Sequence, residues 1–193
     1  MPQDPSFARL VSLACHDVRT PLATVHGFAA TLAKTVEVAP PGDRYVEMIL
    51  AASAQIAELL DELSVAARIA GGRYDPHLRE VDTLQLAEGA AERLGSDRVR
   101  VSGSGAAVRT DVESVDRGVS ALVQSALRHG GLDEVAVIVD GAVIRVSPIV
   151  DSAAKVVLGE DLRDLGAAVA VRLIEALGGT VAVVDGTLAI RLA

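Results

Sequence analysis

One short stretch of the sequence places an imidazole directly beside a carboxylate. The run His16-Asp17-Val18-Arg19-Thr20-Pro21-Leu22 lies within a stretch with helical periodicity. A carboxylate that accepts the Nδ1 proton leaves the lone pair of Nε2 available, which suits a nucleophile. Thr20 falls one helical turn further along on the same side. A lone exposed histidine more often has no chemical role, so the context of His16 decides its interpretation.

The residues around His16 follow the four-three spacing of a heptad repeat. Asp4 and Pro5 form a helix-start signal. The apolar positions of this first helix are Phe7, Val11, Ala14, Val18, Pro21, Val25, Phe28 and Leu32. In this repeat His16 takes position f and faces solvent, whereas Cys15 takes position e beside the core. Pro21 removes one helical hydrogen bond and should bend the helix after His16.

A second heptad helix follows a loop at Pro40-Pro41-Gly42, where Asp43 is available as a cap. It runs until Gly71-Gly72, and its apolar positions are Tyr45, Ile49, Ala52, Ile56, Leu59, Leu63 and Ala66. Two such helices form an antiparallel hairpin whose seam stays half exposed in a monomer. We therefore predict a homodimer in which two hairpins form a four-helix bundle.

The heptad pattern ends at Gly72, and short strand-like runs then alternate with helical stretches. We therefore predict two domains, residues 1–72 and 73–193, in an α+β chain. The second domain should be an α/β sandwich with one mixed or antiparallel sheet and helices on one face. Its expected strands are Val99–Val101, Val135–Val139, Val143–Val146, Thr180–Val184 and Leu188–Leu192. Its expected helices are Thr83–Leu94, Val112–Arg128 and Asp164–Leu177.

Composition excludes several classes of partner. The formal net charge is −8 and no cluster of Lys and Arg appears, which argues against nucleic acid. No signal peptide or apolar run long enough to cross a membrane is evident, so we expect a cytoplasmic protein without a membrane partner. Cys15 excludes an intrachain disulfide because it is the single cysteine. His26, His77 and His129 lack ligand spacing, so we expect no metal site.

The run from His16 to Leu22 resembles the phosphoacceptor motif of sensor histidine kinases, and Gly27 and the hairpin fit as well. The resemblance implies that His16 is phosphorylated and that Asp17 acts as the base. It further implies that Thr20 positions a water molecule for phosphatase activity.

The resemblance extends to the ATPase domain of these kinases. Val108-Arg109-Thr110-Asp111 and the helix after it resemble the opening of that domain, and the segment 172–180 resembles its last helix and turn. Its nucleotide motifs have changed. Ser125 stands where the family has a magnesium-binding Asn. Pro148-Ile149-Val150 replaces the adenine-binding Asp and its glycines, and shifting the register to Asp151 would not restore those glycines.

The last nucleotide motif of the family is a Gly-Leu-Gly turn that binds phosphates, and it reads Asp164-Leu165-Gly166 here. The segment 151–165 is also too short for a lid over ATP. We therefore expect a histidine kinase fold whose ATP site is lost and which needs no cofactor of its own. Magnesium would come from a partner receiver domain.

These features predict a histidine phosphotransfer protein that carries phosphate on His16 to and from the aspartates of response-regulator receiver domains. The chain resembles dimeric histidine phosphotransfer proteins with a kinase-like second domain, but it keeps the kinase-type Arg19-Thr20-Pro21-Leu22. Two alternatives remain open. One is an ATP-dependent sensor histidine kinase with an unusual site, and the other is a non-catalytic pseudokinase scaffold that binds a response regulator.

Overall fold

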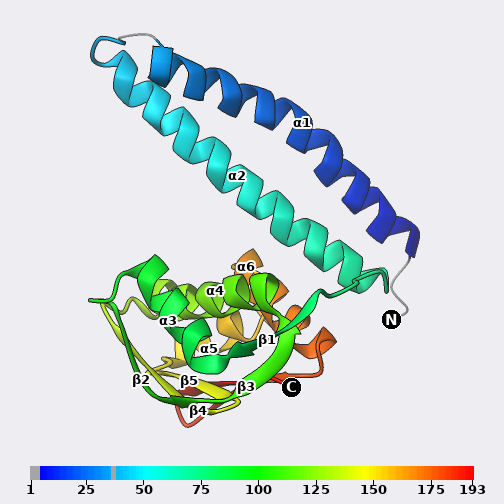
Figure 1. Cartoon of the computed structure of the whole chain (residues 1–193), viewed down its shortest axis with the longest axis vertical. Helices are drawn as coiled ribbons and strands as arrows, with labels where there is room; N and C mark the ends of the chain where they lie inside the picture. Colours follow the sequence, from blue (N-terminus) through cyan, green and yellow to red (C-terminus); the bar gives the residue numbers. More distant parts are fainter. Residues whose placement is uncertain (1–4, 36–37) are drawn as a thin grey trace. The chain divides into compact units, whose positions relative to one another are not determined.

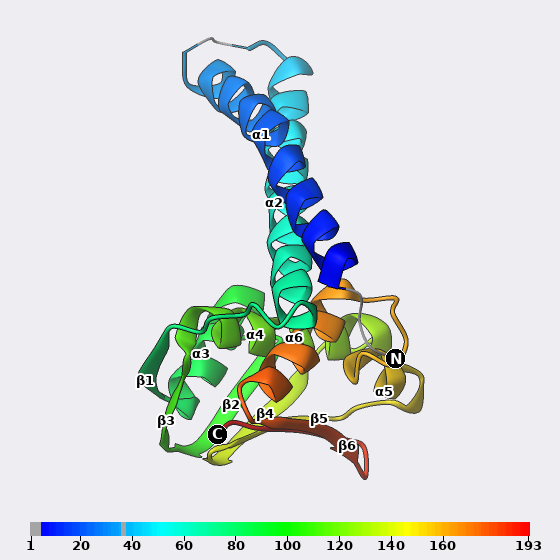
Figure 2. The same cartoon turned by 90° about the vertical axis from the view of Figure 1, so that its right-hand side faces the viewer.

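The chain forms two compact units, Met1–Arg73 and Tyr74–Ala193 (Figure 1, Figure 2). The computed structural model describes residues 5–35 and 38–193. Asp4, the expected residue before the first helix, lies outside this part of the chain. No helix within the described ranges combines the length and the apolar character needed to cross a membrane.

The first unit is an antiparallel hairpin of two long helices, α1 (Pro5–Thr35) and α2 (Gly42–Ala70) (Figure 1). α1 continues through Pro21 without interruption. Asp43 does not cap α2 as expected: it lies in the first turn, and Pro41 occupies the cap position without a side-chain bond. The expected stop is confirmed, because Gly72 adopts a left-handed φ of 62° and donates to the carbonyl of Ile69.

The two helices pack along a stripe one residue further along than the predicted heptad seam. Small side chains dominate this stripe, which contains the buried residues Ala8, Cys15, Ala29, Val46, Ser53 and Ala67. Many large apolar side chains of the predicted seam remain exposed instead, among them Phe28 (69%) and Tyr45 (59%). A heptad pattern marks an apolar face, but it does not say which edge of that face meets which helix. Small side chains occupy the contact between α1 and α2 because they let the two helix backbones approach closely.

The second unit contains a five-stranded mixed sheet with helices on one face (Figure 2). Its strand order is β2-β4-β5-β7-β6. Only β2 and β4 pair in parallel. The strands are β2 (Val99–Gly105), β4 (Val135–Gly141), β5 (Val143–Ser147), β6 (Thr180–Val184) and β7 (Thr187–Arg191). The helices on this face are α3 (Thr83–Leu94), α4 (Val112–Gly130) and α6 (Leu165–Ala176).

Three elements were not predicted. β1 (Leu78–Asp82) and β3 (Ala107–Asp111) pair antiparallel as a separate two-stranded sheet, so the expectation of one sheet was wrong. The third element is the short helix α5 (Asp151–Val157). β1 is mostly exposed, β3 alternates exposed and buried residues, and the two strands pair over about 25 to 33 positions of sequence, so no local apolar run reveals them.

Asp111 anchors the start of the second unit through hydrogen bonds from Tyr74, His77 and Ser114. Its Oδ1 caps α4 by accepting the Ser114 N–H at 3.2 Å. Its Oδ2 accepts the Tyr74 hydroxyl at 2.9 Å and the His77 N–H at 3.3 Å. Burial raises the pKa of the Asp111 carboxyl, but the hydrogen bonds from Ser114, Tyr74 and His77 outweigh burial and hold the pKa below its usual value.

We predict that Asp111→Ala lowers the free energy of unfolding of the second unit by about 1–2 kcal/mol at neutral pH, the range for a lost helix cap. Because the folded pKa of Asp111 is lowered, this contribution is complete above the unfolded pKa of about 4. It disappears as the pH falls through the lower folded value. Urea unfolding and hydrogen exchange of the α4 amides measure it.

The matched control is Tyr74→Phe, which removes one hydrogen bond and should cost less than Asp111→Ala. Equal stability of Asp111→Ala and the wild type at pH 7 would show that the anchor does not stabilise the fold.

Candidate functional site

His16 and Asp17 form an exposed pair on α1. Nδ1 of His16 lies 3.2 Å from Oδ1 of Asp17, and the two side chains are 77% and 65% exposed. The heptad position had predicted this solvent-facing placement of His16. With the proton on Nδ1, the N–H donates a hydrogen bond to the carboxylate, and the lone pair of Nε2 is available to an incoming electrophile.

Thr20 and Pro21 occupy the next turn of the same helix. Both residues are exposed, and the Thr20 carbonyl accepts a hydrogen bond from the Thr24 hydroxyl at 3.2 Å. Proline has no N–H, so residue 21 cannot donate the helical hydrogen bond to the carbonyl of Asp17. The helix thus brings His16, Asp17 and Thr20 together over little more than one turn. One backbone hydrogen bond of the helix, the one that residue 21 would donate, is missing beside them.

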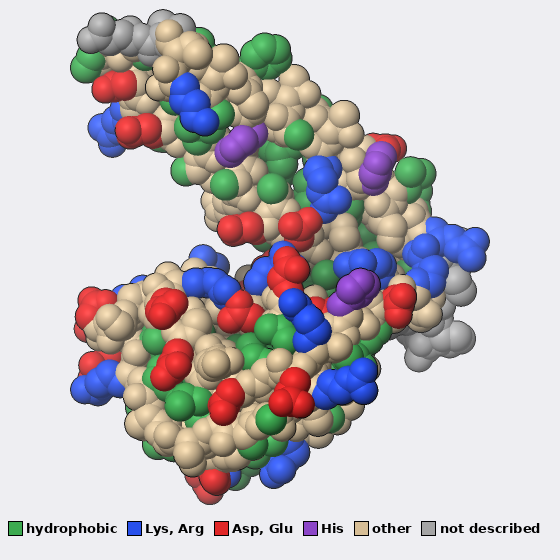
Figure 3. Space-filling view, viewed as in Figure 1, with side chains coloured by type: hydrophobic (Ala, Val, Ile, Leu, Met, Phe, Trp, Pro, Cys, Tyr) green, Lys and Arg blue, Asp and Glu red, His purple; other side chains and the backbone are tan. Residues whose placement is uncertain are grey.

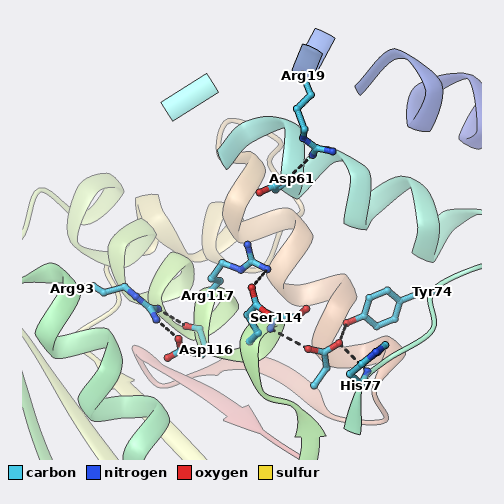
Figure 4. A network of polar contacts seen from close by, with 10 residues as sticks. Arg19, Asp61, Tyr74, His77, Arg93, Ser114, Asp116 and Arg117 are labelled. Atoms are coloured by element: carbon cyan, nitrogen blue, oxygen red, sulfur yellow. Dashed lines mark hydrogen bonds and ion pairs between the residues drawn. The ribbon is translucent and has the colours of Figure 1, made fainter. Parts of the chain in front are cut away.

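An ion pair that sequence reasoning missed joins α1 to α2 next to this site (Figure 4). Nη2 of Arg19 lies 2.5 Å from Oδ1 of Asp61, and the two side chains are 44% and 50% exposed. In the sequence Arg19 stood out only as a member of the motif. No local signal could reveal its partner, because the two residues are 42 positions apart.

The other polar groups in the hairpin do not suggest a second reactive centre. Cys15 is only 1% exposed, which removes its thiol from solvent. Nδ1 of His26 pairs with Oγ of Ser53 at 2.9 Å. Across residues 5–35 and 38–193, no three or more His, Cys, Asp or Glu side chains gather as a metal site would require.

The positions that the sequence resemblance assigns to nucleotide motifs lie on or between α4, α5 and α6 in the second unit. Ser125 is buried on α4, and its hydroxyl has no hydrogen-bond partner among the described residues. Val150 lies at the start of α5 and close to Gly130, because a Cβ on Gly130 would be 3.5 Å from a methyl group of Val150. Gly166 lies in the first turn of α6, which packs against α4, and Pro148 is exposed.

Asp164 completes the N-terminus of α6 with its own side chain. Its Oδ1 accepts the Ala167 N–H at 3.1 Å, and its Oδ2 lies 3.1 Å from Nε2 of His129. The two side chains are only 13% and 17% exposed. No local signal in the sequence reveals this partner of His129, because the two residues are 35 positions apart. Helix N-termini can bind phosphates through their free N–H groups, and the Asp164 side chain engages one of these groups at the start of α6.

Comparison with known proteins identifies the first unit. Residues 8–72 match the family model "His Kinase A (phospho-acceptor) domain". A comparison with curated proteins finds no match.

Two solved histidine kinase structures share the fold. Full-length ShkA in complex with AMPPNP matches with a TM-score of 0.69 and 19% identity, over 94% of this chain and 44% of ShkA. The histidine kinase AdeS of Acinetobacter baumannii matches with a TM-score of 0.56 and 16% identity, over 92% of this chain and 98% of AdeS. This chain therefore spans less than half of the length of ShkA.

At these identities the structural matches establish the fold, while the family model establishes the kind of hairpin. The second unit has the fold of a histidine kinase ATP-binding domain. Residues 8–72 therefore match the His Kinase A phosphoacceptor domain, and the chain as a whole shares the fold of these histidine kinase structures.

Proposed function

We propose that this chain is a histidine phosphotransfer protein and that His16 exchanges phosphoryl groups with the aspartates of receiver domains. The observation that carries the proposal is the contrast between the two units. His16 and Asp17 keep the residue types of the phosphoacceptor motif and are exposed. The start of α6, which would bind nucleotide phosphates, is capped by the carboxylate of Asp164.

In the proposed transfer, Nε2 of His16 attacks the phosphorus of an aspartyl phosphate. The bond from phosphorus to the aspartate oxygen breaks, and the electron pair leaves with the aspartate carboxylate. The imidazole keeps its Nδ1 proton and gains positive charge, which the Asp17 carboxylate offsets at 3.2 Å. The reverse sequence passes the phosphoryl group to a second receiver. Magnesium bound by the receiver would neutralise charge on the phosphoryl oxygens.

The changes in the nucleotide region support a phosphoryl source outside this chain. A triphosphate at the start of α6 would meet the Asp164 carboxylate, and like charges in a partly buried cleft repel by several kcal/mol. Ser125 presents a buried hydroxyl where the family has an amide. α5 takes up residues 151–157, which leaves little chain for a lid before α6 begins at Leu165.

A second candidate function is that of an ATP-dependent histidine kinase. The preserved fold of the second unit favours it, as does the kinase-type run Arg19-Thr20-Pro21-Leu22. The third possibility, a scaffold that binds a response regulator without chemistry, predicts that His16 never carries phosphate. Nucleotide binding separates the kinase from the phosphotransfer protein, and phosphate on His16 separates the scaffold from both.

We expect the wild-type chain to gain a base-stable, acid-labile phosphate when it is incubated with a phosphorylated receiver and magnesium. His16→Gln should abolish the label without loss of stability, because the side chain is exposed. Asp17→Asn should slow transfer about 10²–10⁴-fold, the range for a lost acid–base partner. Thr20→Ala should leave transfer intact and change only the loss of phosphate to water. Radiolabel transfer from a panel of receivers measures all four.

Circular dichroism melts provide the control that each variant is folded. Persistent labelling of His16→Gln, or no labelling of the wild type by any receiver of its own organism, contradicts the proposed function.

We propose that the protein is a dimer through its hairpin. Large apolar side chains remain exposed along both helices, and Figure 3 shows hydrophobic side chains on the surface of the hairpin. Ile56, one of these side chains, is 43% exposed. Pairing with a second hairpin would remove such side chains from water, which is the main driving force of bundle formation.

We predict that Ile56→Asp dissociates this dimer, because an unpaired charge in the interface costs several kcal/mol. Light scattering at micromolar concentration measures the mass. Gln55→Asp adds the same charge at the neighbouring exposed position and should leave the dimer intact. A wild-type monomer under these conditions would rule out the dimer.

We predict that ATP with magnesium does not bind measurably at millimolar concentration, because Asp164 occupies the N-terminus of α6. Calorimetry and nucleotide-dependent melting shifts test this. Asp164→Asn serves as a matched variant, since asparagine also caps helices but carries no charge. A dissociation constant below about 100 μM for the wild type, roughly −5.5 kcal/mol, would favour the kinase function.

A further inference from the structure

The ion pair between Arg19 and Asp61 lies within one helical turn of His16. Residues three apart on a helix are neighbours, with Cβ atoms about 5–6 Å apart. Helical side chains also point toward the N-terminus of their helix, so the side chain of Arg19 extends toward the turn that carries His16. Figure 4 shows the guanidinium of Arg19 directed at Asp61 on α2.

Phosphate on His16 would create an imbalance of charge at this position. A phosphoryl group adds nearly two negative charges, and it would lie beside the exposed carboxylate of Asp17. Arg19 is the only Lys or Arg between residues 12 and 24 of the sequence. A guanidinium carries five N–H donors in a planar fork, so two of them can donate hydrogen bonds to two oxygens of the same phosphate.

We propose that Arg19 binds the phosphoryl group on His16 and that Asp61 is its competitor, which holds the guanidinium while His16 is unphosphorylated. Phosphorylation then transfers the guanidinium from the Asp61 carboxylate to the phosphoryl oxygens. This inference rests on His16 as phosphoacceptor, which is part of the proposed function, but it does not depend on the source of the phosphate.

The competition predicts opposite effects for two substitutions that break the same ion pair. Arg19→Gln removes the ligand of the phosphoryl group and should lower the yield and lifetime of phosphohistidine. Asp61→Asn removes the competitor and should raise both. Each change should be about two- to fivefold, the range for partly exposed ion pairs. If the ion pair only held the helices together, both variants would lose the same contact and would shift in the same direction.

Phosphoramidate is the probe of choice because it needs no receiver. Nε2 of His16 attacks its phosphorus, the P–N bond breaks, and the nitrogen takes up a proton and leaves as ammonia. Phosphorus NMR measures the yield and the decay of phosphohistidine in the full-length chain. Nitrogen NMR of the Arg19 side chain reports whether its environment changes on phosphorylation, which a purely structural ion pair would not require.

Three variants complete the experiment. Glu58→Gln removes a neighbouring negative charge on α2 and should leave yield and decay unchanged. Arg19→Lys keeps the charge without the fork and should fall between the wild type and Arg19→Gln. The double variant Arg19→Gln with Asp61→Asn should behave like Arg19→Gln, because a competitor has no effect once its ligand is absent. Melting curves establish that the variants are folded.

Same-direction shifts of the two single variants, or an unchanged Arg19 signal on phosphorylation, would overturn the proposal. Labelling by phosphoramidate but not by any receiver would contradict the phosphotransfer function and leave the role of Arg19 intact. Failure of phosphoramidate to label His16 in the wild type would overturn both.

Discussion

The close packing of small side chains between α1 and α2 is the contact on which the functional surface of the hairpin depends. Ala8, Cys15, Ala29, Ser53 and Ala67 face the neighbouring helix, so the two backbones approach each other. This packing has two consequences. Large apolar side chains remain exposed on the outside of the hairpin, and His16 faces solvent beside Asp17. The same packing brings Arg19 within reach of Asp61 across the hairpin.

The second unit repeats one device at three helix starts. The helices α3, α4 and α6 each begin after an aspartate whose side chain accepts a backbone N–H of the first turn. These aspartates are Asp82, Asp111 and Asp164. A carboxylate at a helix N-terminus satisfies the same donors and the same dipole that a phosphate would. At α6 the Asp164 carboxylate takes up one of these donors, and its Oδ2 lies 3.1 Å from Nε2 of His129 on α4. The fold can therefore persist although we propose that nucleotide no longer binds.

We propose that the two units separate two roles that a histidine kinase combines. The hairpin presents the exposed imidazole of His16, its neighbouring acid and a nearby guanidinium. We propose that the second unit keeps the shape of an ATP-binding domain without its phosphate site, so that phosphoryl groups arrive from a receiver. Arg19 would then connect the chemical state of His16 to the contact between the helices, because the guanidinium cannot fully serve both the phosphoryl group and Asp61.

Local patterns in the sequence were sufficient to predict the two long helices, all five strands of the main sheet and the solvent-facing position of His16. Heptad spacing, glycine stops and the run from His16 to Leu22 all act within a few residues, so they can be recognised without a fold. The exact stripe of contact in the hairpin could not be predicted, because neighbouring stripes of a heptad are both compatible with helix packing. The pairing of β1 with β3, the Asp61 partner of Arg19 and the Asp164 partner of His129 also escaped prediction. These contacts join residues more than 20 positions apart, and only the tertiary structure brings them together.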